Sequence, residues 1–229
     1  MMKYGYFLGL IGLLCIAGCQ RQPKDQTAAV VDQQQYVSKS VQDQFQTWQN
    51  QQAPNSVDDY PRYVELRVKQ PLSLFSLSYN GHRMPKQCQP LRFSIPPKAL
   101  WPNIIPSLKL IERFQSQGIY AHYRIISTYR SDEMNTCIQG AQLSKHRQNH
   151  AVDFKVLNAA QQPYTDAEYQ QIEQQLCAFW HKSGKALNMG LGIYAGHSLH
   201  IDVAGYRTWG GDYRRQSSPC MRSETSVGK

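Results

Sequence analysis

SKHRQNHAVDF, residues 144–154, places His146 seven positions before Asp153, where an alternating apolar pattern begins. The apolar residues of HAVDFKV recur with a period of two: Val152, Phe154 and Val156. This period predicts a β-strand with those side chains on one face and Asp153 on the other. Hydrophobic packing requires neither a histidine nor a carboxylate here, so the stretch predicts a strand that carries a polar site.

A second stretch, SLHIDVAG, has the same alternation. Its apolar positions are Leu199, Ile201 and Val203, and its polar positions are Ser198, His200 and Asp202. If the two strands pair in one sheet whose apolar face is covered by helices, Asp153 and His200 project from the same polar face. His146 can then reach this face from the loop just before the first strand.

Two imidazoles and one carboxylate form a ligand set that suits zinc in a catalytic site, where three protein ligands leave a fourth position for water. A structural zinc site would need a fourth ligand, usually cysteine, and the sequence places none nearby. Taken singly, His146 is read more simply as a solvated loop residue and Asp153 as a hydrogen-bonding group at a strand end. The combination of all three residues is what predicts a metal site.

The remaining pattern predicts an α+β domain with a mainly antiparallel sheet, flanking helices and a zinc cleft on the polar face of the sheet. One helix is expected between Pro106 and Gly118, after which YAHYRIIST reads as a strand. Ser131 is placed to cap a short helix that ends at Gly140. A longer helix opens with the capping box at residues 165–168 and continues toward residue 184.

The N-terminal residues have the layout of an export signal. Lys3 precedes the apolar run YFLGLIGLLCIAG, which is shorter than the roughly 20 residues needed to span a membrane. The run ends in Ile16-Ala17-Gly18-Cys19, which resembles a bacterial lipobox. We expect residues 1–18 to be a lipoprotein signal peptide and Cys19 to be lipidated. An ordinary signal peptide with a chance cysteine is the alternative.

Residues 19–60 are rich in Gln, Asp, Ser and Ala and predict a flexible tether, with a short helix possible between Val41 and Gln51. The folded domain is expected over residues 61–229. It would begin with PRYVELRVKQ, in which Val64, Leu66 and Val68 alternate with charged residues as in a half-buried strand.

Export also determines how the other cysteines are interpreted. Four remain once the signal and the lipidated residue are set aside: Cys88, Cys137, Cys177 and Cys220. An even number in an oxidising compartment predicts two disulfides, and three pairings are possible. A metal site made of four cysteines is disfavoured because no two of them have the close spacing of structural zinc ligands.

The composition limits the function classes. The chain has 229 residues and a formal net charge of +9, which suits an anionic polymer of the cell envelope but is also a common solubilising feature. No basic run or array of basic and aromatic residues indicates nucleic-acid binding. We expect one main domain and a monomer.

The motifs together resemble the D-alanyl-D-alanine zinc metallopeptidases, the superfamily that includes the amino-terminal domain of hedgehog proteins. The resemblance rests on STYRSDEMN at 127–135, SKHRQNHAVDF at 144–154 and MGLGIYAGHSLHIDVAGYRTWG at 189–210, and it is greatest to the periplasmic murein endopeptidase branch. It implies that His146, Asp153 and His200 bind zinc and that the substrate is a peptide of peptidoglycan. It also suggests that Arg130 clamps a substrate carboxylate or stabilises the oxyanion.

The general base is less evident, because many relatives carry an acidic residue where this chain has His197. His197 is one candidate base, since imidazole titrates near neutral pH. Asp202 is another, although it could equally orient the imidazole of His200. A salt bridge is the structural alternative for Arg130.

These features predict a zinc-dependent peptidoglycan endopeptidase, anchored by its lipid in the periplasm, in the outer membrane if the organism is Gram-negative. Two alternatives remain from the sequence. The first is a non-catalytic lipoprotein that uses the zinc-containing fold to bind peptidoglycan. The second is a carboxypeptidase that removes a terminal D-Ala and uses Arg130 to bind the free carboxylate.

Overall fold

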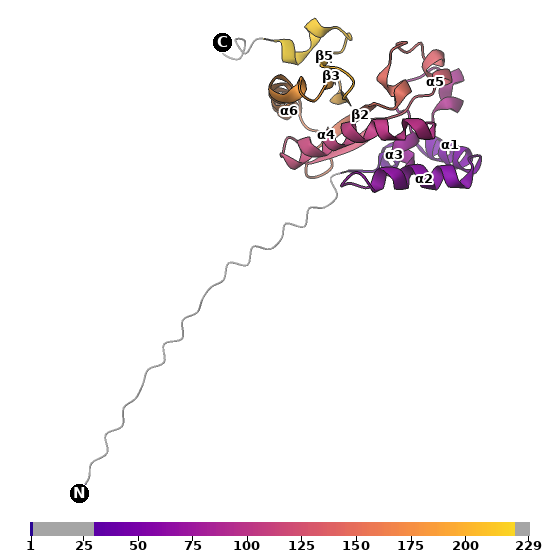
Figure 1. The fold of residues 1–229 in the computed structure, drawn as a ribbon, viewed down its shortest axis with the longest axis horizontal. Coiled ribbons are helices and arrows are strands. Elements are labelled where there is room, and N and C mark those ends of the chain that lie inside the picture. The colour runs from indigo at the N-terminus through magenta and orange to yellow at the C-terminus, as the bar shows by residue number, and fades with distance from the viewer. Residues whose placement is uncertain (2–29, 223–229) are drawn as a thin grey trace.

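The computed structural model describes Met1 and residues 30–222, apart from the side chain of Pro54. Cys19 and all of the expected signal peptide except Met1 lie outside the described residues. None of the described helices is both long and apolar enough to cross a membrane. Helices flank a single sheet, with α1 (Lys39–Asn50), α2 (Pro54–Glu65) and α3 (Leu74–Ser78) at one end of the molecule and α6 (Asp166–Phe179) at the other (Figure 1).

The sheet has five strands in the order β1-β2-β4-β3-β5. The strands are β1 His122–Ser127, β2 Ala151–Leu157, β3 Gly190–Tyr194, β4 Ser198–Asp202 and β5 Arg207–Trp209. All neighbouring pairs are antiparallel except β3 and β5, which are parallel. The expectation of an α+β fold with a mainly antiparallel sheet is therefore confirmed, and the sheet is strictly a mixed one.

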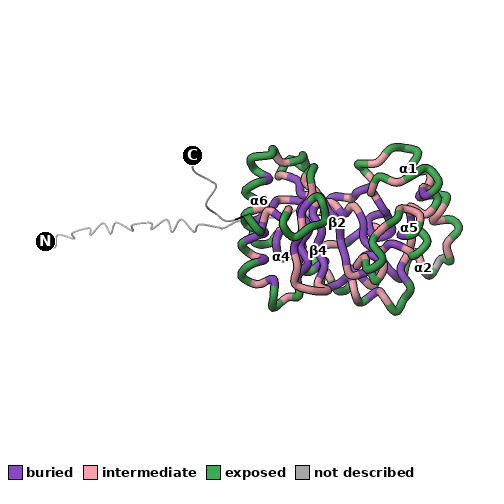
Figure 2. The backbone as a smooth tube through the Cα atoms, turned by 90° about the horizontal axis from the view of Figure 1, so that it is seen from above, coloured by how far each residue is buried: buried purple, intermediate pink, exposed green. Residues whose placement is uncertain are grey.

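The two strands at the centre of the prediction are direct neighbours. In the register of β2 and β4, Asp153 lies opposite His200 and Phe154 opposite Leu199. Both strands are buried along most of their length (Figure 2). Their apolar side chains join the main core, and the period of two sends Asp153 and His200 to the opposite face.

The helices cover the apolar face and both ends of the sheet. The α-helices are α1 Lys39–Asn50, α2 Pro54–Glu65, α3 Leu74–Ser78, α4 Ile105–Ser116, α5 Asp132–Cys137 and α6 Asp166–Phe179. Short 3₁₀ segments are η1 Gln33–Tyr36, η2 Lys86–Leu91, η3 Lys98–Ile104, η4 Lys145–Gln148, η6 Arg215–Ser217 and η7 Pro219–Met221, and the π-helical segment η5 is Trp180–Gly184. Helix α4 contacts β2 and β4, and its apolar residues join α6 in the main core.

The N-terminal region confirms the short helix expected between Val41 and Gln51, which is α1, but otherwise differs from its prediction. A flexible tether over residues 19–60 is wrong for residues 33–60, which contain η1, α1 and the start of α2. The few apolar residues of this polar segment have helical spacing, so Phe45 is buried in an aromatic cluster with Phe75 and Phe93. The boundary between residues 60 and 61 falls inside α2. Only residues 19–29 of the expected tether lie outside the described part of the chain.

The strand expected in PRYVELRVKQ is also wrong, because its first residues form the end of α2. Val64 is completely buried, whereas Leu66 is 73% exposed. An alternating strand would place these two side chains on the same face. The pair that shares a buried face is instead Tyr60 and Val64, which are four residues apart as in a helix.

Two disulfides join distant segments, as the cysteine count predicted. Cys88 in η2 pairs with Cys137 at the end of α5, and Cys177 in α6 pairs with Cys220 in η7. The structure thus selects one of the three possible pairings. The first bond ties the loop after α3 to the helix that follows the YRS turn.

Replacing Thr165 with Ala is expected to lower the free energy of unfolding by about 1 kcal/mol. The Thr165 hydroxyl accepts a hydrogen bond from the Glu168 backbone amide, and the Glu168 carboxylate accepts one from the Thr165 amide, so the predicted capping box is confirmed. Urea denaturation measures the change. Thr165→Ser keeps the hydroxyl and should behave like the wild type; an equal loss in both variants would contradict the capping explanation.

Candidate metal centre

The three predicted metal ligands meet on the polar face of the sheet. Asp153 comes from β2, His200 from β4 and His146 from η4, the turn that leads into β2. All three are buried, with exposed fractions of 4%, 6% and 4% respectively. One donor atom from each lies within 4.8 Å of the other two. The two histidines are 54 residues apart in the sequence, and the pairing of β2 with β4 brings their segments together.

The two imidazoles approach different oxygens of the same carboxylate. His146 Nε2 lies 2.9 Å from Asp153 Oδ2, and His200 Nδ1 lies 2.8 Å from Asp153 Oδ1. The far nitrogens also have partners: His146 Nδ1 is 2.5 Å from the Thr128 carbonyl oxygen, and His200 Nε2 is 3.0 Å from Asp202 Oδ2. Metal-binding histidines characteristically donate their second nitrogen to a carbonyl or carboxylate in this way. The donor set therefore fits a zinc ion, with His146 Nε2, His200 Nδ1 and Asp153 facing it.

The charges of the site favour an ionised carboxylate. Burial by itself would raise the pKa of Asp153, but His146, His200 and His82 outweigh burial and hold that pKa well below its usual value. Burial lowers the pKa of His146. Burial acts in the same direction on His200, but Asp153 and Asp202 raise its pKa to about 9. The carboxylate is thus ready to bind a cation.

Asp202 contacts the ring nitrogen of His200 that does not face Asp153. It is completely buried, accepts from His200 and lies 2.5 Å from a guanidinium nitrogen of Arg207. Its backbone partner on β3 is Gly190, where an added Cβ would lie 2.5 Å from Asp202 Oδ2. These contacts are those of a residue that orients the imidazole, the second of the two roles considered for Asp202.

Replacing Gly192 with Ala is expected to destabilise the fold by about 1–3 kcal/mol through overpacking. A Cβ at Gly192 would lie 2.7 Å from the ring of Trp209. That ring is 5.0 Å from the ring of His200, and its Nε1 donates to the Tyr194 hydroxyl at 2.8 Å. The substitution should therefore lower the midpoint of unfolding, which denaturation followed by circular dichroism measures. Gly211→Ala, where an added Cβ meets nothing within 4 Å, is the matched control, and equal effects at the two glycines would contradict the overpacking explanation.

Arg130 is buried beside the metal centre. Its side chain is 8% exposed, and its backbone amide donates to the His146 carbonyl oxygen at 3.1 Å. One guanidinium nitrogen makes a long contact of 3.4 Å to Asn135 Oδ1, and among the described residues Nε has no hydrogen-bond partner. Burial lowers the pKa of Arg130, and the charge of Asp153 opposes that shift. A buried guanidinium with a free donor is able to bind a carboxylate.

His197 is not brought to the metal centre. Its φ of 59° lies in the left-handed region of the turn between β3 and β4. Its Nε2 lies 2.9 Å from Asp166 Oδ1, and its ring stacks on Tyr169 at 4.2 Å. Both partners belong to α6, which packs on the apolar side of the sheet. These contacts do not support the prediction of His197 as a catalytic base.

The sequence interpretation missed His82. Its Nε2 lies 2.6 Å from Asp153 Oδ2. No spacing motif marks it, because it precedes Asp153 by 71 residues and comes from the loop after α3. Only the tertiary structure identifies it.

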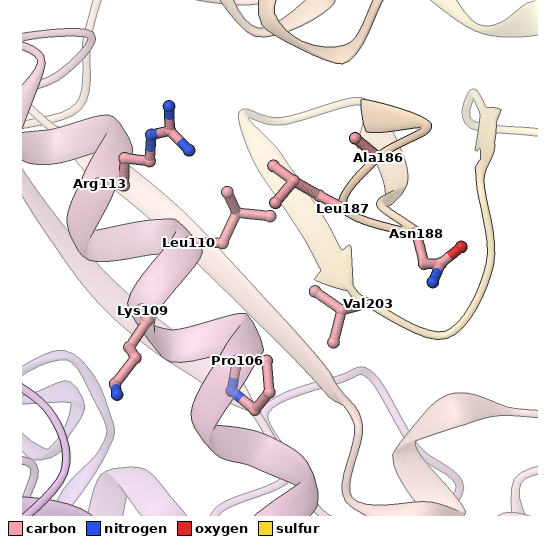
Figure 3. Close-up of a pocket in the computed structure, with 8 residues that line it drawn as sticks. All are labelled: Pro106, Lys109, Leu110, Arg113, Ala186, Leu187, Asn188 and Val203. Carbon is pink, nitrogen blue, oxygen red and sulfur yellow. The ribbon is translucent and has the colours of Figure 1, made fainter. Parts of the chain in front are cut away.

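The zinc cleft expected on the polar face of the sheet stays a prediction. A cavity of about 470 Å³ lies between α4 and the segment around residues 186–188 (Figure 3). Its lining includes Leu110, Leu187 and Val203 but none of the metal ligands. This cavity is separate from the candidate metal centre.

Comparison with known proteins supports the metal assignment. Residues 107–182 match the family model Peptidase M15. The matched segment contains Arg130, His146 and Asp153, whereas His82 and His200 lie outside it. No curated protein and no solved structure matches the chain. The match supports a zinc metallopeptidase of the M15 superfamily, which is also the class of enzyme that the donor set suits.

Proposed function

We propose that the chain is a zinc-dependent peptidoglycan peptidase that cleaves peptide cross-links as an endopeptidase. The observation that carries this proposal is the convergence of His146, Asp153 and His200 in a chain whose residues 107–182 match Peptidase M15. The resemblance of the motifs to the murein endopeptidase branch supplies the finer assignment. The formal net charge of +9, which becomes +8 when the signal peptide with Lys3 is removed, is favourable for approach to an anionic envelope polymer.

The contacts of the site suggest a separate role for each residue. Zinc, when bound, supplies an acidified water and a Lewis acid for the peptide carbonyl. Asp202 and the Thr128 carbonyl keep the two imidazoles in the tautomers that leave His200 Nδ1 and His146 Nε2 free to bind the ion. Arg130 would orient the substrate by donating to a carboxylate of the stem peptide.

A carboxypeptidase is the second candidate, and the buried Arg130 is the observation that favours it. A guanidinium whose Nε has no partner among the described residues suits the terminal carboxylate of a D-Ala-D-Ala peptide. Stem peptides in cross-links also carry free carboxylates, so Arg130 serves either reaction. The two candidates differ in the product released.

For location, we propose export, lipidation at Cys19 and attachment to the periplasmic side of the outer membrane. The support is the lipobox-like Ile16-Ala17-Gly18-Cys19 after a short apolar run. The two disulfides are compatible with an oxidising compartment. Radiolabelled fatty acid incorporated by the wild type and not by Cys19→Ala would support the anchor; label in both proteins would refute it.

The experiment that tests the function is digestion of purified sacculi by the full chain, with zinc, with chelator, and with zinc restored. Mass spectrometry of the released muropeptides identifies the bond. Monomers produced from cross-linked dimers indicate an endopeptidase, and a loss of the mass of one alanine indicates a carboxypeptidase. Binding to sacculi without any zinc-dependent product would refute both and favour a wall-binding module.

A further inference from the structure

His82 reaches the metal centre because its segment extends the sheet beyond β1. Asn80 forms an antiparallel bridge with Ser127, the β1 residue whose partner on β2 is Asp153. The Gly81 amide donates to the Ile126 carbonyl oxygen at 2.9 Å. His82 follows directly, so the backbone pairing carries its ring to the carboxylate of Asp153.

The segment is held in this place by several independent contacts. Asn80 is completely buried, accepts from the Ser127 hydroxyl at 2.9 Å and donates to the Tyr129 carbonyl oxygen at 3.2 Å. At Gly81 an added Cβ would lie 2.9 Å from the Ile126 carbonyl oxygen, so glycine permits the close approach. The disulfide of Cys88 anchors the same loop a few residues later. His82 is therefore built into the site from a fixed backbone.

The contact between His82 and Asp153 has a defined chemistry. Asp153 Oδ2 has two imidazole neighbours, His82 Nε2 at 2.6 Å and His146 Nε2 at 2.9 Å. An ionised carboxylate can only accept, so His82 Nε2–H is the donor. The group of donor atoms that lie within 4.8 Å of one another comprises His146, Asp153 and His200 among the described residues, without His82. The His82 side chain is also 38% exposed, compared with 5% for that of His146.

We propose that His82 is a positioning residue of the metal centre: it donates Nε2–H to Asp153 Oδ2 and thereby fixes the orientation in which this carboxylate binds the ion. The inference rests on the proposed function, because it assumes that the centre holds zinc. It adds a residue from the N-terminal half of the chain, outside the segment that matches Peptidase M15. The loop after α3 thus completes a site whose other residues come from the sheet and from η4.

The test measures zinc affinity by chelator competition in the full chain and in its His82→Ala and His82→Gln variants. Loss of a hydrogen-bonding partner behind a metal ligand typically weakens metal affinity about 10–100-fold. We expect this loss in His82→Ala and a substantial recovery in His82→Gln, whose amide also donates. His181→Ala is the control, because its imidazole pairs with the Cys220 carbonyl oxygen away from the centre.

Each outcome has a separate meaning. Equal zinc affinity in His82→Ala and the wild type would overturn the positioning role. If both variants are weakened equally and zinc X-ray absorption shows one imidazole fewer, His82 is a direct ligand and the positioning role is overturned as well. A folded wild type that binds no zinc would refute the proposed function itself. Because this result needs only the wild type, it is distinguishable from a failure of the role of His82. Circular dichroism of each variant confirms that the comparison is between folded proteins.

Discussion

His200→Ala is expected to lose zinc binding and peptidoglycan hydrolysis together. Only three donor groups converge in the described structure, and removal of one leaves His146 and Asp153. Asp202 would also lose the imidazole that it orients at 3.0 Å. The loss of affinity should exceed the roughly 10–100-fold typical of a supporting residue, because a direct ligand is removed. Metal content after dialysis and muropeptide release from sacculi measure the two effects.

The matched control is His197→Ala, three positions earlier in the same chain segment. His197 pairs with Asp166 and stacks on Tyr169, so its loss should cost about 0.5–1 kcal/mol of stability and leave zinc content and hydrolysis unchanged. Zinc retained by His200→Ala at wild-type affinity would refute the metal centre. Hydrolysis lost in a folded, zinc-loaded His197→Ala would restore His197 as a catalytic candidate.

The convergence of Asp153 and His200 could be predicted from sequence because local periodicity determines the directions of their side chains. Alternation in HAVDFKV and SLHIDVAG fixes which face Asp153 and His200 occupy, whatever the rest of the fold does. The capping box at Thr165 is similarly local, since all its partners lie within four residues. Patterns of this kind remain valid when the tertiary structure is unknown.

The positions of His197 and His82 cannot be predicted from local sequence patterns. The direction of the His197 ring follows from a positive φ in a turn, and two helical residues of α6 then hold it. His82 reaches Asp153 because Asn80 and Gly81 pair with the end of β1, where Asn80 bridges to Ser127, 47 residues away. Long-range pairing of this kind leaves no periodic signal in either segment.

Spacing predicts α1 between Val41 and Gln51, but the polar composition hides α2 and the packing of both helices on the domain. Gln dominates residues 33–52, which predicts a segment with too little apolar surface to fold. A few large side chains at helical spacing are nevertheless enough, because Phe45 and Tyr60 bury almost completely against the rest of the domain. The region expected to be a linker is therefore part of the folded structure.

Tyr60→Ala is accordingly expected to destabilise the protein by about 3–5 kcal/mol, the range for truncating a large buried aromatic residue. Tyr60 is completely buried, and its ring lies 5.3 Å from that of Trp101. Its hydroxyl contacts the side chain of Asn149, which ends the η4 turn that carries His146. The same substitution should thus weaken zinc binding, and chemical denaturation with and without zinc measures both effects.

Two control variants separate burial from the polar contact. Tyr60→Phe keeps the ring and removes only the hydroxyl, so about 1 kcal/mol should be lost. Leu66→Ala, at the exposed end of the same helix, should change stability by less than about 0.5 kcal/mol. A flexible tether would instead make Tyr60→Ala as mild as Leu66→Ala, and that result would contradict the packing of α2 on the domain. The hydroxyl of Tyr60 contacts Asn149, at the end of the turn that carries His146. If zinc affinity also falls in Tyr60→Phe, then α2 supports the metal centre directly, and not only through the stability of the fold.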